Sequence, residues 1–314
     1  IYGTPAAAAD ATVTATAQPL PHLRNVANDY DVAHQTLIQY ADFLTTQLSR
    51  HALAELFPSV ESMVRDYRFD PEAIFHLTRA ITLPSFIGAS ENSSSSSSGD
   101  SSKDSSDSGK DSSKDNSGTV TNSVVTSLQC AIDSGLTAFV APEFVVAFWL
   151  MALPDIVFPA AAYDRSTREV ARELEHFGAL PAEQQREQRK RRKRLEAVLD
   201  DLRHDRAKQE RACAATLAFV HAHKGAWLGA AMGDAAGFRA GLLRVLERML
   251  VPRCLWSSSD ALYCAHFFLM LHSTGTPRFR TVAYLDAVFE LVPRLLFCCT
   301  EEEANNIGYF VQCT

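Results

Sequence analysis

The chain has 314 residues, 46% of them apolar, so it is long enough to bury at least one substantial core. Its formal net charge is −7, but the charges are segregated along the chain, so the average bears on solubility and not on any partner. No apolar stretch approaches the roughly 18 residues of a membrane-spanning helix, and seven cysteines without framework-like spacing predict reduced thiols inside a cell and no secreted disulfide scaffold.

Helix-forming residues dominate over β-branched runs, and alternating strand patterns bounded by turns are hard to find. The sequence therefore predicts an all-α protein. Residues 1–28 are rich in Ala, Thr and Pro without periodicity and are expected to form a linker. A helical segment is predicted over 29–88. Within it, apolar residues recur at helical spacing from Asp29 to about Leu56, and Asp70-Pro71 offers an N-cap followed by proline.

Residues 89–120 form a serine-rich insertion, with 15 serines between positions 90 and 117. Such a tract cannot bury enough apolar area to offset the cost of ordering it, so we expect it to be disordered. Its interleaved aspartates would suit a phosphorylation target, although an insertion without a specific role explains the tract more simply.

A second helical segment is predicted over 121–163. Helical periodicity resumes between Val124 and Phe139, and a further helix is expected from Glu143 to Leu153. This second helix carries apolar side chains around nearly its whole circumference, which is typical of a buried helix.

Residues 164–224 are predicted to form a long charged helical arm. Its second helix is expected over 182–224, with an apolar seam that is interrupted between Arg203 and Arg211 and returns at Cys213. Helices with one narrow seam pair along their length, so we expect an antiparallel hairpin or a coiled-coil-like arm.

The remaining segment, 225–314, is predicted to be an array of short helices. Ser257 with Asp260, and Thr300 with Glu303, have the spacing of capping boxes. Successive helices without strand or nucleotide motifs suggest a stacked, solenoid-like array, although no repeat period is visible. Both ends of the sequence resemble cuts through a longer polypeptide, so we expect a fragment that is truncated at its C-terminus.

Cysteines and histidines crowd the last third of the chain and first suggest a metal or catalytic centre. The residues concerned are Cys254, Cys264, His266, His272, Cys298 and Cys299. The sequence has no CxxC pair, two of the cysteines are adjacent, and Cys264 and His266 would point to nearly opposite sides of a helix. It also lacks the short motifs of hydrolases, zinc proteases and nucleotide-binding loops. We therefore expect buried core cysteines, with no catalytic residue, metal, cofactor or small-molecule substrate.

A basic run carries seven cations in nine residues. They are Arg186, Arg189, Lys190, Arg191, Arg192, Lys193 and Arg194. Three interpretations compete: a solvated helix face, a nuclear localisation signal, or a contact with nucleic acid or an acidic partner. No aromatic residue interrupts the run, so base stacking of the kind used by single-strand-binding proteins is not indicated.

Several blocks, in order, resemble the THO complex subunit 2 family. In the last third these are Pro252-Arg253-Cys254, Asp260 to Phe267, Thr276 to Phe279, Asp286 with Phe289, Cys299-Thr300-Glu301, Glu303-Ala304 and Gly308. Upstream they are Pro142-Glu143-Phe144, Phe148-Trp149, Asp155, Pro159 and Tyr163, with weaker similarity at Pro71-Glu72-Ala73 and Phe75. The resemblance covers about 29–314 apart from the serine tract, and it departs from the family pattern at Asn306-Ile307 and Tyr309.

The resemblance implies a non-enzymatic, α-helical scaffold in the nucleus, part of the THO/TREX machinery that couples transcription to mRNA processing and export. Such a scaffold would bind other THO subunits, a DEAD-box RNA-dependent ATPase and export adaptors, with RNA as a further partner and no membrane. The alternative is an independent helical RNA- or DNA-binding module that uses the basic run 186–194.

Overall fold

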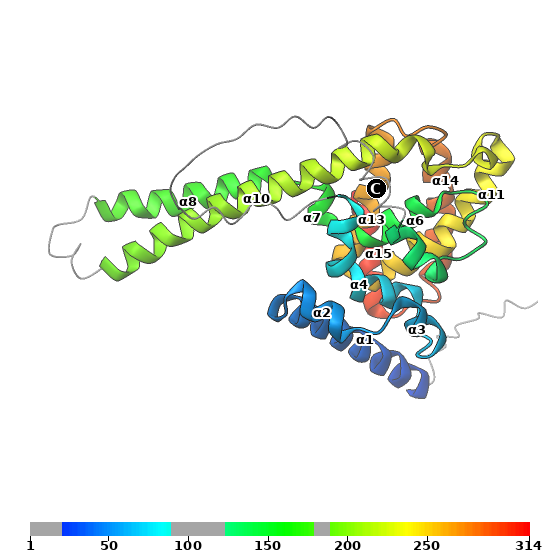
Figure 1. Ribbon diagram of the computed structural model, residues 1–314, viewed down its shortest axis with the longest axis horizontal. Coiled ribbons are helices and arrows are strands. Elements are labelled where there is room, and N and C mark those ends of the chain that lie inside the picture. The colour runs from blue at the N-terminus through cyan, green and yellow to red at the C-terminus, as the bar shows by residue number, and fades with distance from the viewer. Residues whose placement is uncertain (1–20, 89–122, 179–188) are drawn as a thin grey trace, which may run out of the picture.

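The structure is a computed structural model that describes residues 21–88, 123–178 and 189–314, and the regular elements in these ranges are helices (Figure 1). Extended backbone pairs there at a single isolated antiparallel bridge, between Val140 and Leu228. The predicted all-α class is confirmed. None of the helices in these ranges combines the length and the apolar character needed to cross a bilayer.

The helices fall into a first group, an arm and a second group. The first group consists of α1 (Pro21–Gln47), α2 (Arg50–Leu56), α3 (Val60–Arg65), α4 (Pro71–Phe86), a short helix over 123–128, η1 (Gln129–Ala131), α6 (Pro142–Leu150) and α7 (Leu153–Ile156). The arm consists of α8 (Ala160–Gly178) and α10 (Arg189–Trp227). The second group consists of η2 (Ala230–Met232), α11 (Ala235–Val245), the π-helical turn η3 (Leu246–Leu250), α12 (Val251–Trp256), α13 (Ser258–Ser273), α14 (Thr281–Leu295) and α15 (Glu301–Cys313).

The body of the molecule is built around α6. Every residue from Phe144 to Leu150 is buried, and α4, α10 and η3 pack against this helix. On the side of α13, the rings of Phe148 and Phe267 meet edge to face, with their centroids 5.2 Å apart. The predicted buried helix is therefore confirmed, although it ends at Leu150 and not at the expected Leu153.

A buried helix leaves its last carbonyl groups without water, so they must find partners in the protein. The carbonyl of Phe148 accepts a hydrogen bond from the Tyr263 hydroxyl (3.0 Å) and another from the guanidinium of Arg253. Arg253 also donates to the carbonyl of Met151 (2.6 Å). From α4, Arg79 donates to the carbonyl of Leu150 (2.7 Å). Side chains from three other helices thus satisfy the end of α6.

Arg253 is the most deeply buried cation among the described residues, with 4% of its surface exposed. Its Nε lies 2.9 Å from Asp260 Oδ1, and its guanidinium carbon lies 3.8 Å from the centroid of the Tyr263 ring. Desolvation is the largest single influence and opposes the charge on Arg253. The charge and hydrogen bond of Asp260, together with Tyr263 and Cys264, outweigh it and raise the pKa of the guanidinium. Arg253 is therefore held as a cation inside the core.

The first helix predicted from the sequence is wrong in its boundaries. The helix expected from Asp29 to Leu56 is interrupted at Ser49, whose side chain accepts a hydrogen bond from the amide of Ala52 and caps α2. The first part, α1, begins earlier than expected, so residues 21–28 of the expected linker are helical. The rest of that linker, 1–20, lies outside the described residues, as does the serine-rich insertion.

The helix expected between Val124 and Phe139 is also wrong, because it ends at residue 128. A single 3₁₀ turn follows, and then Asp133 accepts a hydrogen bond from the amide of Gly135 at 2.8 Å. Such a local side-chain bond favours a turn over continued helix.

Both predicted capping positions begin helices. Thr300 and Glu303 form a complete capping box at the start of α15. At α13 the Ser257 side chain accepts from the amide of Asp260, but the Asp260 carboxylate contacts the Ser257 hydroxyl and Arg253 instead of returning to the Ser257 amide. The second hydrogen bond of the capping box is therefore absent at α13, because the Asp260 carboxylate pairs with Arg253.

Replacing Arg253 tests its role. Arg253→Met removes the charge at similar length, leaves Asp260 without its cation and deprives two buried carbonyls of a donor. Breaking a buried ion pair in this way costs about 3–5 kcal/mol, so we expect the free energy of unfolding in urea to fall by about that amount. The matched control is Arg244→Met, which removes an exposed pair with Glu247 and should cost less than about 1 kcal/mol. Equal losses in the two variants would contradict this role.

Candidate contact surface on the charged arm

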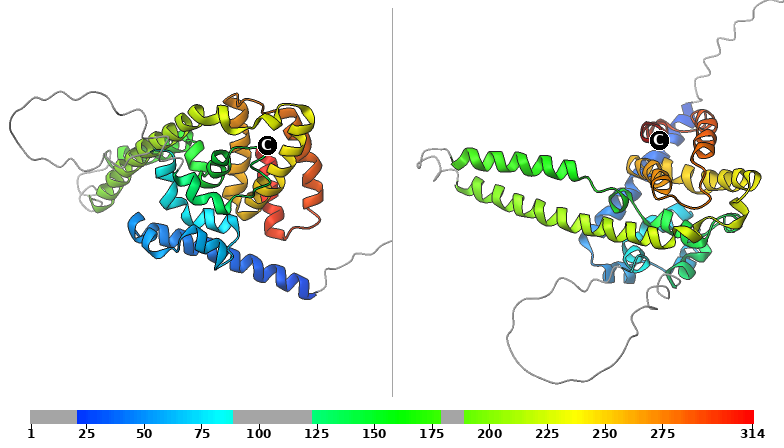
Figure 2. Two further views of the ribbon diagram at one scale, coloured as in Figure 1. Left: turned by 45° about the vertical axis from the view of Figure 1, so that its right-hand side comes forward. Right: turned by 90° about the horizontal axis from the view of Figure 1, so that it is seen from above.

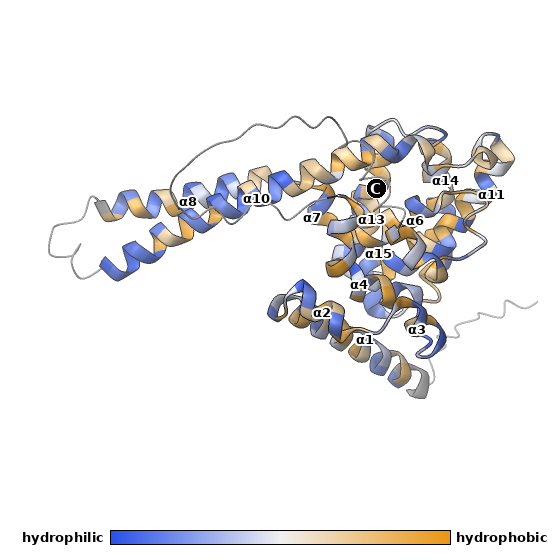
Figure 3. Ribbon diagram, in the orientation of Figure 1, coloured by the Kyte–Doolittle hydropathy of each residue, from blue (hydrophilic) through white to orange (hydrophobic). Residues whose placement is uncertain are grey.

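The arm is an antiparallel pair of helices that projects from the body (Figures 1 and 2). Near the body, Arg206 of α10 pairs with Asp164 of α8 at 2.5 Å. Farther out, Arg191 pairs with Glu173 at 3.0 Å. Because the contacts move forward in α8 as they move backward in α10, the two helices run in opposite directions. The predicted charged hairpin is confirmed, and Figure 3 shows hydrophilic residues prevailing at its outer end.

The basic run lies at the start of α10, at the outer end of the arm. Arg186 lies outside the described residues. Arg191 turns toward α8, where it pairs with Glu173 and its guanidinium carbon lies 5.3 Å from the centroid of the Phe177 ring. Arg192 pairs with Glu196 on its own helix at 2.9 Å. Arg191 thus joins the two helices of the hairpin, whereas Arg192 makes its ion pair within α10 alone.

The other four described cations, Arg189, Lys190, Lys193 and Arg194, are exposed and make no ion pair with any carboxylate that the structure describes. At about 100° per residue they cover a continuous sector of about 140° around α10. Leu195, Leu199 and Leu202 occupy the opposite side, which faces α8. We call these four residues the basic face. The structure thus separates two exposed cations that pair with glutamates, Arg191 and Arg192, from one outward sector of four cations without an ion pair among the described residues.

The basic face suits oxyanions. Guanidinium and ammonium groups on an exposed surface attract phosphates or carboxylates, with little cost of desolvation and with strong dependence on salt. The nearest phenylalanine, Phe177, is buried beneath Arg191, so no exposed Phe, Tyr or Trp ring among the described residues at the tip offers a platform for base stacking. The arrangement can therefore hold a charged backbone without reading its sequence.

Between Arg203 and Arg211, where the apolar seam of α10 is interrupted, polar contacts hold the helix to its neighbours. Arg206 bonds to Asp164, and the Gln209 amide donates to the carbonyl of Pro154 just before α8. The apolar contacts then return: Cys213, Phe219 and Val220 are buried against the body. The gap between Arg203 and Arg211 thus marks the point where the arm leaves the core.

The inner end of α10 is fixed to the segment before α6. The amide of Ala141 donates to the carbonyl of Trp227, and the amide of Gly229 donates to the carbonyl of Phe139, both at 2.8 Å. A Cβ added to Gly229 would lie 2.9 Å from the Phe139 carbonyl oxygen, so the close approach of the two backbones requires glycine there. The arm and the core therefore share one uninterrupted helix.

The cysteines and histidines of the last third do not converge. Cys254 and Cys264 are buried core residues, His272 is exposed, and Cys298 is exposed beyond the end of α14. Across the parts of the chain that the structure describes, no three His, Cys, Asp or Glu side chains come close enough to hold one metal ion. The predicted core role is confirmed for Cys254 and Cys264. It is wrong for Cys298, which is exposed because α14 ends before it, and for Cys299, which is only half-buried.

Comparison with known proteins matches residues 137–314 to a family model described as Tho2, transcription factor/nuclear export subunit protein 2. Proteins named THO complex subunit 2 are similar over most of the chain. The human protein is 26% identical over 292 residues, which cover 93% of this chain and 18% of its own length. The Arabidopsis thaliana protein is 26% identical over 308 residues, which cover 93% of this chain and 16% of its own length. The Saccharomyces cerevisiae protein is 27% identical over 172 residues, which cover 54% of this chain and 10% of its own length. The chain thus spans less than a fifth of the length of each of these relatives.

The polar contacts at the root of the arm can be tested by Arg206→Ala. Loss of a partly exposed ion pair costs about 0.2–1 kcal/mol, so hydrogen exchange in α8 should accelerate by up to about fivefold. The control Arg203→Ala removes an exposed pair with Asp200 within α10 and should leave exchange in α8 unchanged. Equal exchange in wild type and Arg206→Ala would show that Asp164 does not hold the hairpin.

The buried thiols predict a pattern of chemical modification. Burial raises the pKa of Cys254 to about 12, with the Asp260 charge adding to the shift, and burial raises the pKa of Cys264 as well. At pH 8 iodoacetamide should modify the exposed Cys130 and Cys298 at least about 100-fold faster than these two, because the thiolate is the reacting form. Peptide mass mapping measures the rates, and unfolding in guanidinium should equalise them. Rapid modification of Cys254 in the folded protein would contradict its burial.

Proposed function

The chain belongs to the Tho2 family, and from that premise we propose that it is a scaffold segment of the THO complex in nuclear mRNA processing and export. The observation that carries the proposal is the family match over 137–314. This range contains α6, both helices of the arm and the whole second group of helices. The segment that defines the family is thus a helical body with a projecting arm, which suits a protein that holds others together.

The partners belong to the proposal because the chain spans only a part of its relatives. We propose that the body and the arm bind other THO subunits, and that the assembly receives a DEAD-box RNA-dependent ATPase and export adaptors. Extended helical arrays present long surfaces to several partners at once, which supports this role. A nuclear location follows from the same proposal, and a localisation signal in the basic run is consistent with it.

We propose that this segment has no catalytic activity of its own. The sequence lacks the short motifs of hydrolases and nucleotide-binding loops. Two buried polar residues of the family blocks, Arg253 and Tyr263, bond to the end of α6, and the partly buried Asp260 pairs with Arg253. Their positions are explained by packing, without recourse to a substrate.

RNA is proposed as a further, weaker partner of the basic face. Within a scaffold, this face would hold a phosphate backbone or an acidic protein surface while the body binds other subunits. The alternative, an independent RNA- or DNA-binding module, is less well supported because α10 continues from the basic face into the core of the body.

Replacing the cations of the basic face distinguishes RNA binding by this face from the binding of other THO subunits. The variant Arg189→Gln, Lys190→Gln, Lys193→Gln and Arg194→Gln removes four cations. If all four meet single-stranded phosphates, the slope of log affinity against log salt should become less negative by about 3. A scaffold predicts that other THO subunits still co-purify with the variant from nuclear extract, as measured by mass spectrometry.

The control removes four exposed cations nearer the body, by Arg165→Gln, Arg168→Gln, Lys208→Gln and Arg211→Gln. It should leave the salt slope of RNA binding unchanged. Unchanged RNA affinity in the variant of the basic face would exclude both the RNA contact and the independent module. Absence of other THO subunits from the wild-type co-purification would overturn the scaffold.

A further inference from the structure

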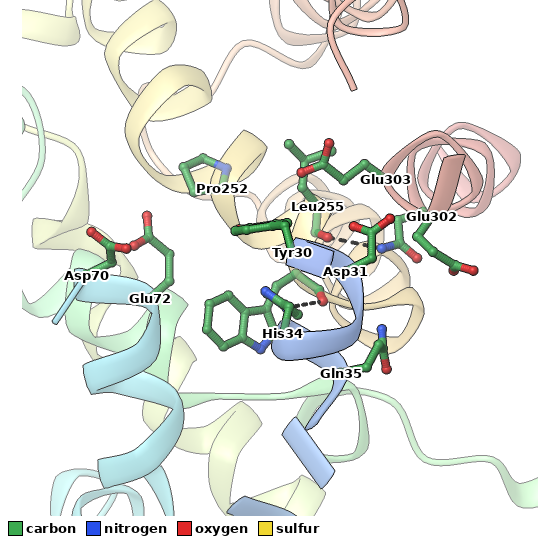
Figure 4. A pocket seen from close by; sticks show the side chains of 12 residues that line it. Tyr30, Asp31, His34, Gln35, Asp70, Glu72, Pro252, Leu255, Glu302 and Glu303 are labelled. Carbon is green, nitrogen blue, oxygen red and sulfur yellow. Dashed lines mark hydrogen bonds between the residues drawn. The ribbon is translucent and has the colours of Figure 1, made fainter. Parts of the chain in front are cut away.

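Two adjoining cavities lie between α1, α4, the junction of α12 and α13, and α15. Their volumes are about 280 and 300 Å³, and Glu72 and Trp256 form part of the wall of both. We call them together the acidic groove. Figure 4 shows the first cavity: Tyr30 stands on α1 between Asp70 and Glu72 on one side and Glu302 and Glu303 on the other.

Carboxylates outnumber arginines in the walls of the groove. The first cavity is lined by Asp31, Asp70, Glu72, Glu302 and Glu303, and the second adds Asp42 and Asp260. The cations in the walls, Arg79 and Arg253, are already paired with Asp155 and Asp260. None of the five carboxylates of the first cavity is ion-paired to a cation within the described ranges, and the only basic side chain in its lining is His34, which donates to the carbonyl of Trp256. The groove therefore carries an excess of negative charge.

Negative charges from three helices act on Tyr30 in the first cavity. Burial raises the pKa of Tyr30, and Glu303, Asp70, Asp31 and Glu72 add to the shift. These carboxylates come from α15, from the start of α4 and from α1. Burial also raises the pKa of Glu72, and the charge of Asp70 adds to it. A backbone hydrogen bond offsets part of this shift. A positively charged ligand beside the two carboxylates would be attracted by their charge.

Aromatic rings complete the walls. Tyr30 is 56% exposed, so its ring face is accessible. Trp256 borders both cavities, and the His34 ring meets it edge to face with the centroids 4.3 Å apart. An exposed ring beside several carboxylates is the arrangement that holds a guanidinium or an alkylammonium, by combining cation–π attraction with charge-assisted hydrogen bonds.

The geometry distinguishes between classes of ligand. No three of these carboxylates meet as the ligands of one metal ion among the described residues, so the groove does not gather its charge at a single point. Phosphates would be repelled, which excludes a nucleic-acid backbone. Each cavity lies at or below the lower end of the usual size range for small-molecule sites, about 300–1,000 Å³. The dimensions therefore suit long side chains presented by a polypeptide.

We propose that the acidic groove binds a basic, arginine-containing segment of a partner protein, with one guanidinium in the cavity beside Tyr30 and Glu72. The neighbouring cavity beside Trp256 receives an adjacent side chain of the same segment. This site is separate from the basic face of the arm and attracts ligands of the opposite charge, so it does not depend on the RNA contact proposed above.

The test uses the full chain and two fluorescein-labelled ten-residue peptides that alternate arginine or glutamate with serine. Fluorescence anisotropy should detect binding of the arginine peptide only, weakening as salt is raised. The double variant Asp70→Asn and Glu72→Gln should reduce its affinity about tenfold or more, because two charge-assisted contacts are lost. The matched control Asp201→Asn and Glu210→Gln, on the exposed surface of the arm, should reduce it by less than about twofold.

A second pair of variants tests the ring. Tyr30→Leu should weaken binding several-fold, whereas Tyr30→Phe, which retains a ring face, should bind as the wild type does. Thermal melting establishes that each variant remains folded. The four-residue variant of the basic face should bind the arginine peptide normally, so failure of this site and failure of the RNA contact are distinguishable. Equal affinity in the groove variants and the arm control, or no binding of the arginine peptide, would overturn the proposal.

Discussion

The complete burial of α6 imposes the constraint on which the rest of the body depends. A helix that is apolar on every side can be enclosed by its neighbours, but its final carbonyl groups then lose access to water and must be satisfied by protein donors. Arg253, Arg79 and Tyr263 supply these donors from three different helices. Two polar residues of the family blocks, Arg253 and Tyr263, thus surround one helix end together with Arg79, and this packing explains their positions.

The same solution recurs at other helix ends. The body consists of short helices, and each C-terminus exposes carbonyl groups that favour a positive charge or a strong donor. Arg50 donates to the carbonyl of Ile81 near the end of α4, Lys224 to Thr274 after α13, and Asn306 to Leu255 near the end of α12. Because most of these bonds join residues far apart in the sequence, they fix the arrangement of helices as well as their lengths.

The features that the sequence predicted correctly depend on residues close together in the chain. The capping pairs Thr300/Glu303 and Ser257/Asp260, the apolar circumference of α6 and the seam of the arm depend on neighbours within a turn or two, and all were recognisable. The break at Ser49 was missed because apolar spacing continues through it, and only the cap reveals it. The contacts of Arg253 with residues more than 100 positions away, and a groove built from α1, α4, α12 and α15, arise from tertiary packing. No period or motif in the sequence could reveal them.

The continuity of α10 has a mechanical consequence. This helix of 39 residues reaches about 58 Å, from the basic tip to Trp227, whose ring lies 5.6 Å from that of Phe144 in α6. The bridge between Val140 and Leu228 joins its inner end to the segment that leads into α6. The arm therefore acts as a lever with its short end in the core. A load on the tip exerts torque at the start of α6, and the arm cannot swing freely without disturbing the helix that organises the body.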